Sequence, residues 1–551
     1  MIDIGLKCYK KMKPNELKEG KTPVELGTPL SSISIDLTEG CSLRCTYCFT
    51  NLETKNKKNN NKLSLKIGKE IIDWFLKDST SGTIEDIKKR KQPLNIDWWG
   101  GEPFLEFSLM KNLTKYAQDK AKEAGKEIKF GGTTNIVSLT EEKVNWIINN
   151  NAHFLLSCDG RGERNKERPF PNGKNSWDVM RKKLSMIMRV YKKHKVPFMP
   201  KIRLTATPST LKGIASDLIY FHEQDWGEIF FSENHDAEWS ENDFKVFKDE
   251  LNQISEYRIN SLSKGKFLTT KFFDDPVKNI FANSMSDKKI PANGPGWSCG
   301  AGKTFMGASV EGALYICHRT NKHDTLNKVW HDKENCLGSI YEGITNIKKY
   351  KELQELKVPA LIENSPLSHC KDCPIELTCL GGCIASLIDS TGSPSGKHAI
   401  YCTIRMTYYD IISEEIKKVI LSGKLKEYLH IIGVKLGANK FTPQGSEFHC
   451  TCNESYYTSL VRNYKHFLDK KELDGVLEPQ KLDEAYMLQF ISLIAENSLK
   501  EVVGKGYNKQ GCLCNNGSFN DNGAEEKIKN LTSEEVKGLV EIFQKFLERS
   551  Q

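Results

Sequence analysis

Residues 32–50 read SISIDLTEGCSLRCTYCFT, and both the fold and the chemistry of the chain are indicated by this stretch. In residues 32–37, Ser and Asp alternate with Ile and Leu, which predicts a β-strand. Directly after it, Cys41, Cys45 and Cys48 are spaced as C-x3-C-x2-C. Three thiolates can hold three irons of a four-iron, four-sulfur cluster and leave the fourth iron open for chemistry. Structural zinc is the competing interpretation, but it needs four closed ligands, and no fourth Cys or His lies nearby in the sequence.

This strand is the first of six β-rich runs that alternate with amphipathic segments. A strand followed by a helix, repeated six times, predicts an α/β fold with a parallel sheet and crossover helices, curled into a partial (β/α)6 TIM-like barrel or left open. In such folds the chemistry lies at the carboxyl ends of the strands. The other β-rich runs are 94–99, 128–134, 153–159, 201–208 and 227–233, and the helical patterns are 66–78, 106–124, 140–151, 176–194 and 209–224.

The length of 551 residues predicts two to four domains. The regions expected are an N-terminal arm, the barrel, a helical bridge, a Cys-rich domain held by metal, and a mainly helical C-terminal extension. Their residues are 1–30, 31–240, 241–292, 293–412 and 413–551, respectively.

The composition excludes several classes of protein. Hydrophobic residues make up 38% of the chain, which is enough for packed cores and too much for a disordered protein. No window approaches 18 uncharged apolar residues, and the first residues lack the apolar run of a secretory signal, so we expect a cytoplasmic protein without a membrane partner. The net charge of +9 is modest for this length and does not imply nucleic acid.

Cysteine is the most informative residue type. In a reducing compartment, 17 Cys cannot form a disulfide framework, so they point to metal or redox chemistry. Fourteen of them fall into three groups, and we expect the other three, Cys8, Cys158 and Cys336, to be ordinary small residues, buried or partly buried. The second group is Cys299, Cys317, Cys370, Cys373, Cys379, Cys383 and Cys402, and the third is Cys450, Cys452, Cys512 and Cys514.

The first group resembles the cluster motif of the radical SAM superfamily, which has this spacing and an aromatic residue, here Tyr47, before the last Cys. Matching segments follow in order at the ends of later strands. The resemblance implies that GGEP contacts the amino group of S-adenosylmethionine, that SCDG lies near its ribose and methionine portions, and that an Arg pairs with its carboxylate. The implied cofactor-binding residues are Tyr47, Gly100, Gly101, Glu102, Pro103, Thr134, Asn135, Ser157, Asp159 and Arg203.

The second group is similar, position for position, to the seven-cysteine SPASM pattern of radical SAM enzymes that act on peptides and proteins. The resemblance implies two auxiliary clusters, and therefore three 4Fe-4S clusters in all. Cys370, Cys373, Cys379 and Cys402 would ligate the distal cluster, and Cys299, Cys317 and Cys383 the nearer one. Some members of the family have an eighth Cys shortly before the first; residues 289–298 contain none, so an open iron is expected on the nearer cluster.

His318 follows Cys317, at the position where sulfatase maturases of this family have an Asp as proton acceptor. Cys-His-Arg at this point resembles maturases of ribosomally synthesised, Cys-containing peptides, in which thioether or related crosslinks form. His318 is therefore the candidate catalytic base, and the alternative is a solvated or hydrogen-bonded histidine without a catalytic role.

The two Cys-x-Cys pairs of the third group match no family pattern. Four thiolates suit a tetrahedral zinc ion or a further iron–sulfur cluster, and the alternatives are two redox-active disulfides or reduced, unliganded thiols. Because only 40 residues precede Cys41, we expect any leader-peptide recognition to come from the extension or from a separate protein.

The resemblance implies an oxidoreductase-type enzyme that reductively cleaves S-adenosylmethionine to a 5′-deoxyadenosyl radical. The radical would abstract hydrogen from a Cys-containing peptide or protein substrate, with flavodoxin or ferredoxin as electron donor. Two alternatives stay open within the SPASM class, a formylglycine-forming sulfatase maturase and another dehydrogenase. A third is a non-enzymatic iron–sulfur or zinc-binding protein, which leaves the GGEP and SCDG segments unexplained.

Overall fold

The computed structural model describes about three fifths of the chain, grouped into two compact units. One unit comprises 1–250, 297–357 and 381–402, and the other comprises 251–296, 358–380 and 403–551. Cys370, Cys373 and the four cysteines of the third group lie outside the described residues. The described residues are 20–50, 62–77, 93–262, 264–284, 299–320, 335–356, 379, 381–394, 396, 398–422 and 424–433.

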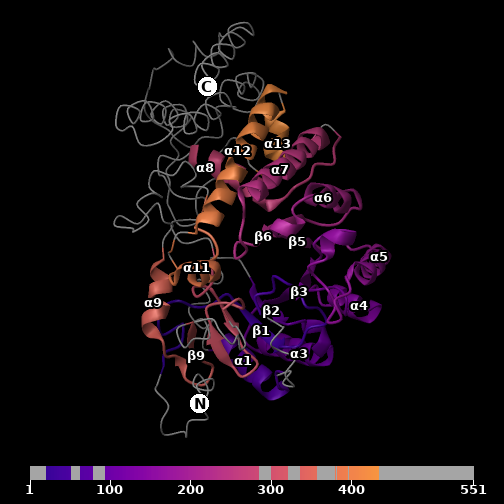
Figure 1. The fold of residues 1–551 in the computed structure, drawn as a ribbon. Helices are drawn as coiled ribbons and strands as arrows, with labels where there is room; N and C mark the ends of the chain where they lie inside the picture. The colour runs from indigo at the N-terminus through magenta and orange to yellow at the C-terminus, as the bar shows by residue number, and fades with distance from the viewer. Residues whose placement is uncertain are drawn as a thin grey trace, which may run out of the picture. The chain divides into compact units, whose positions relative to one another are not determined.

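The first unit is built on one sheet with the strand order β10-β9-β8-β7-β1-β2-β3-β4-β5-β6. Strands β1 to β6 are parallel and follow one another in sequence order, with helices between them along one side (Figure 1). The predicted α/β fold with six strand–helix repeats is therefore confirmed. The strands are β1 (Ser32–Thr38), β2 (Leu94–Gly100), β3 (Ile128–Thr134), β4 (His153–Ser157), β5 (Ile202–Ala206) and β6 (Ile229–Glu233), and the helices are α1 (Leu65–Lys77), α3 (Phe107–Glu123), α4 (Glu141–Asn149), α5 (Trp177–His194) and α6 (Ile214–Glu223).

The parallel strands form because their apolar residues are covered by the crossover helices. Ile33, Ile35 and Leu37 of β1 are fully buried. Each of these helices buries apolar residues, such as Val144 and Ile147 of α4. The start of α4 is also capped, because the side chain of Thr140 accepts a hydrogen bond from Lys143 N. This packing brings the carboxyl ends of β1 to β6 to one edge, where the motifs lie.

The Cys-rich segment extends the same sheet. Strand β7 (Phe305–Ala308) pairs in parallel with β1, and the short strands after it pair antiparallel. Cys336 in β9 and Cys158 after β4 are buried, and each thiol donates to a glycine carbonyl. The expected burial of these two cysteines is confirmed, and Cys8 lies outside the described residues. The remaining elements are β8 (Ala313–Tyr315), β9 (Cys336–Ser339), β10 (Gly343–Ile344), α9 (Ile347–Glu355) and α11 (Ile384–Thr391).

The second unit is helical in its described part. It contains α8 (Lys271–Ser284), α13 (Leu425–Ile431) and parts of α7 (Glu241–Leu262) and α12 (Ala399–Leu421). Its centre holds a buried arginine, Arg258, which donates to Glu415, Asp274 and the hydroxyl of Tyr428. Among the described residues, no helix combines the length and apolar composition needed to cross a membrane.

Candidate cofactor and metal site

Cys41, Cys45 and Cys48 lie on the loop that leaves the carboxyl end of β1. All three are free thiols of intermediate exposure, and they are close enough to interact electrostatically. Burial, reinforced by Glu102, raises the pKa of Cys41 to about 11, and burial raises that of Cys45 to about 12. Buried thiols become thiolates when a cation binds them, so this donor set fits an iron–sulfur cluster. Among the described residues, no three Cys, His, Asp or Glu side chains surround the position of a single metal ion.

The GGEP motif packs against the start of this loop. Gly101 N donates to Thr38 O, and Glu102 N donates to Gly40 O, both at 2.8 Å. A Cβ on Gly101 would lie 2.2 Å from Gly40 O, and Gly100 has a φ of 122°. Only glycines fit these two positions. Pro103 then opens the short helix η3 (Pro103–Glu106). The motif therefore fixes the backbone directly before Cys41.

The carboxylate of Glu102 is buried and accepts three hydrogen bonds. The donors are Phe104 N at 3.2 Å, the Thr134 hydroxyl at 2.9 Å and Asn135 N at 2.7 Å. The Asn135 amide in turn donates to Cys41 Sγ at 3.4 Å. Three of the residues predicted to bind S-adenosylmethionine thus form a chain of contacts that ends on a cysteine of the first group.

Tyr47 and Asp159, two more of the predicted residues, bind each other. The Tyr47 hydroxyl donates to Asp159 and accepts from Arg168 Nη1 at 2.7 Å. Asp159 also accepts from Thr205 N at 2.9 Å, and an oxygen of its carboxylate lies 3.8 Å from Arg168. Sequence reasoning missed Arg168, because one arginine in a polar loop gives no signal of its own. The group connects the cysteine loop to the ends of β4 and β5.

Arg203, the second residue of β5, is the register partner of Ser157, the last residue of β4. The Nε of Arg203 is buried and has no hydrogen-bond partner among the described residues. Burial and the nearby Arg319 lower the pKa of Arg203. A buried guanidinium with an unused donor fits the carboxylate of a small ligand such as S-adenosylmethionine.

The second group is represented by five described cysteines. Cys299, Cys317 and Cys383 belong to the first unit and interact electrostatically. Burial raises the pKa of Cys317 to about 12. These are the three residues predicted for the nearer cluster, and their thiols suit one. Cys379 and Cys402 are also free thiols of intermediate exposure, and their predicted companions Cys370 and Cys373 lie outside the described residues.

His318 stacks on an aromatic ring. Its imidazole lies 3.6 Å from the Trp99 ring, centroid to centroid, at an interplanar angle of 14°. Burial, followed by Arg319 and Arg203, lowers its pKa to about 3. Its Nδ1 is buried without a hydrogen-bond partner among the described residues. The imidazole is thus neutral and weakly basic in this setting, and its catalytic role stays a prediction.

Comparisons with known proteins agree with this geometry. The family model described as a 4Fe-4S single cluster domain matches residues 34–179. The cysteine-type anaerobic sulfatase-maturating enzyme of Clostridium perfringens is 24% identical over 374 residues, which are 64% of this chain and 89% of the enzyme. The structure of native anSMEcpe with bound AdoMet and Cp18Cys peptide superposes with a TM-score of 0.53 at 20% identity, over 71% of this chain and 98% of that one. In sequence and in fold, the chain is therefore similar to a radical SAM maturase.

A further relative matches over a shorter stretch of this chain. The uncharacterized protein MJ0907 of Methanocaldococcus jannaschii is 26% identical over 170 residues, so the chain spans about half of that protein's length. The match amounts to 31% of this chain. The family match at residues 34–179 supports the predicted 4Fe-4S cluster, and the similar structure of anSMEcpe contains bound AdoMet.

Proposed function

We propose that this enzyme is a peptide or protein maturase that forms a thioether or another crosslink on a Cys-containing substrate. The proposal rests on a contact between the two cysteine groups. Phe49, which follows Cys48, contacts His318 and Arg319, which follow Cys317. Phe49, next to Cys48, lies 6.0 Å from the ring of His318, and the Arg319 guanidinium lies 5.5 Å from the Phe49 ring. A substrate held between the two groups would be within reach of both clusters.

S-adenosylmethionine, bound at a first cluster held by Cys41, Cys45 and Cys48, would supply the 5′-deoxyadenosyl radical that removes a hydrogen atom from the substrate. The chain itself would hold the reactants. Asn135 and Glu102 would orient Cys41, and Arg203 would pair with the carboxylate of S-adenosylmethionine. We place three 4Fe-4S clusters in the enzyme and expect a flavodoxin or ferredoxin as donor, in the cytoplasm.

The nearer auxiliary site would receive the substrate thiol. Arg319 Nη1 lies 3.5 Å from Cys383 Sγ, and its Nη2 donates to Asp236 at 2.8 Å. A fixed positive charge beside three thiols favours thiolate ligation. With Cys299, Cys317 and Cys383 as the protein ligands, the fourth iron is free for a soft sulfur ligand from the peptide.

Formylglycine formation is the second candidate, because the Clostridium perfringens relative is a sulfatase-maturating enzyme. His318 occupies the position at which the resemblance places an Asp as proton acceptor in that class. This residue favours crosslinking over formylglycine formation.

Product mass separates the two candidates. The anaerobically reconstituted enzyme, reduced with dithionite, is incubated with S-adenosylmethionine and either the Cp18Cys peptide or a short Cys-rich peptide encoded beside its gene. A crosslink removes two hydrogens and keeps the sulfur, whereas formylglycine removes two hydrogens and replaces sulfur by oxygen. We expect the first product on the neighbouring peptide; formylglycine on Cp18Cys would establish the second candidate instead.

A further inference from the structure

The loop 158–169 after β4 is hydrogen-bonded to the backbone of the segment that carries the first cysteine group. Arg44 N donates to Pro169 O at 2.8 Å, and Thr46 N donates to Glu167 O at 3.0 Å. Arg168 adds the side-chain contact to Tyr47 described above. The backbone between Cys41 and Cys48 therefore takes its position from this loop.

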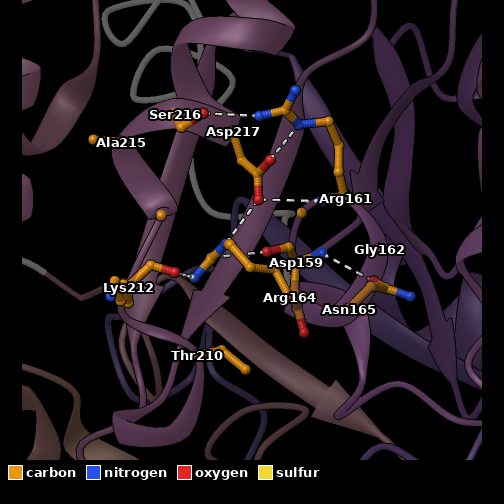
Figure 2. Close-up of polar contacts among 12 residues, drawn as sticks. Asp159, Arg161, Gly162, Arg164, Asn165, Thr210, Lys212, Ala215, Ser216 and Asp217 are labelled. Carbon is orange, nitrogen blue, oxygen red and sulfur yellow. Dashed lines mark hydrogen bonds and ion pairs between the residues drawn. The ribbon is translucent and has the colours of Figure 1, made fainter.

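The other end of the loop is held by one carboxylate of α6, Asp217 (Figure 2). Its Oδ2 accepts from Arg161 N at 3.1 Å and from Arg164 Nε at 2.7 Å, and its Oδ1 accepts from Arg161 Nε at 2.5 Å. The side chain of Asp217 is only 3% exposed. Charge-assisted hydrogen bonds in such a buried place are strong and directional.

Arg164 passes this constraint to the cofactor site. While its Nε binds Asp217, its Nη2 donates to Asp159 O at 2.9 Å. The side chain of Asp159 accepts hydrogen bonds from the Tyr47 hydroxyl and from Thr205 N. Gly160 leaves room for the carboxylate, because a Cβ there would lie 2.0 Å from Asp217 Oδ2. Asp217 thus reaches the cysteine loop through Arg164 and Asp159.

We propose that Asp217, acting through the fork of Arg164, is a positioning residue that sets the geometry of the S-adenosylmethionine site. The inference rests on the proposed function, since it concerns the same cofactor. The side-chain hydrogen bonds of Asp217 go to Arg161 and Arg164, and not to the three cysteines of the first group or to the side chains predicted to contact the cofactor. Its role is to hold the backbone of Asp159 and the loop up to Pro169 in one arrangement.

A purely stabilising role for Asp217 can be separated from positioning, because α7 supplies a matched control that also binds α6. Glu250 of α7 is a buried carboxylate that accepts from the start of α6, from Gly213 N at 2.7 Å and from Ala215 N at 2.9 Å. Among the described residues, no hydrogen bond or ion pair joins Glu250 to loop 158–169. Loss of either carboxylate loosens α6, but only loss of Asp217 releases the loop.

The test compares Asp217→Asn, Arg164→Lys and Glu250→Gln in the full chain, reconstituted anaerobically. S-adenosylmethionine affinity is measured by titration, and deuterium uptake is measured for peptides covering 41–48 and 158–169. We expect Asp217→Asn to weaken the affinity about 10-fold, as loss of an outer-shell contact does, and to raise uptake in both segments. Arg164→Lys keeps the charge but loses the fork, so it should behave the same way. Glu250→Gln should lower thermal stability without either effect.

The proposal is overturned if Asp217→Asn only lowers stability and matches Glu250→Gln in affinity and in uptake at 41–48. It is equally overturned if uptake rises at 158–169 but not at 41–48. Should the parent enzyme fail to bind S-adenosylmethionine, the proposed function is wrong, and the uptake at 41–48 still decides whether Asp217 positions the cysteine loop.

Discussion

Glu102 has an unusual place for a single carboxylate, because it is almost fully buried and has no cationic partner among its hydrogen bonds. Burial raises its pKa, while the bonds from Asn135 N, Thr134 and Phe104 N oppose that rise. Hydrogen bonds to a charged acceptor contribute about 1.5–3 kcal/mol each when the alternative is an unpaired group. The carboxylate organises the donors around Cys41 by accepting from all three.

Glu102→Ala is therefore expected to lower the free energy of unfolding by about 3 kcal/mol and to reduce the iron bound by the first cysteine group. The matched control is Glu106→Ala, one helical turn away, where the carboxylate only pairs with Lys62 at 2.5 Å. That change should stay within about 0.5 kcal/mol and leave the iron content intact. Equal iron content in both variants would contradict the role given to Glu102.

Strand β2 carries Asp97, and burial disfavours the charged form of its carboxyl group. Asp97 pairs in register with Ser34 of β1 and Gly131 of β3, and burial raises its pKa from 3.8 to about 6. The pKa of Asp97 is higher in the folded protein than in the unfolded chain. The folded protein therefore loses stability relative to the unfolded chain as the pH rises from about 4 through about 6 and Asp97 has to ionise.

Asp97→Asn should thus stabilise the enzyme relative to the parent, and the gain should grow by about 1 kcal/mol between pH 5 and pH 7.5. Denaturant unfolding under anaerobic conditions at the two pH values measures it. Asp119→Asn on the exposed side of α3 serves as the control and should show no such growth. A gain that is the same at both pH values would show that Asp97 does not titrate in this range.

The helices of the second unit are tied together by the buried ion pairs of Arg258. Its Nε and Nη2 lie 2.9 Å from Glu415 and Asp274, respectively, and Glu415 is fully buried. Removing one partner of a buried pair leaves an uncompensated charge. Glu415→Gln should lower the unfolding free energy by about 3 kcal/mol, whereas Glu414→Gln, which removes a surface pair with Lys417, should change it by less than about 0.5 kcal/mol. Similar midpoints in guanidinium for the two variants would disprove the structural role of Arg258.

At the scale of elements, the sequence predicted what local patterns encode. The six barrel strands are short β-rich runs between amphipathic helices, and the structure has them within a few residues of the expected positions. The pairing of β7 with β1 could not be predicted, because four residues, FMGA, carry no periodic signal. Arg168 was missed for a related reason: its partner Tyr47 is 121 residues away, and only the fold brings them together. Motifs supplied the candidate cofactor residues, but they did not reveal that Glu102 and Asp159 accept hydrogen bonds from protein donors.

At the scale of the whole molecule, the third cysteine group is a separate question, since Cys450, Cys452, Cys512 and Cys514 lie outside the described residues. Two Cys-x-Cys pairs still predict one shared metal, because four thiolates complete a tetrahedral site. Replacing all four by Ser should remove one zinc, or about four irons, per chain and leave the other cysteine groups loaded. Unchanged metal content would favour disulfides or free thiols.

The central claim is that the loop after β1 holds the cluster at which S-adenosylmethionine is cleaved. The direct measurement is 5′-deoxyadenosine formed after dithionite reduction by the parent enzyme, by the variant with Cys41, Cys45 and Cys48 replaced by Ala, and by a control with the buried Cys158 and Cys336 replaced by Ala. We expect product from the parent and the control and none from the triple variant, which should keep part of its iron in the auxiliary clusters. Undiminished 5′-deoxyadenosine from the triple variant would contradict the assignment.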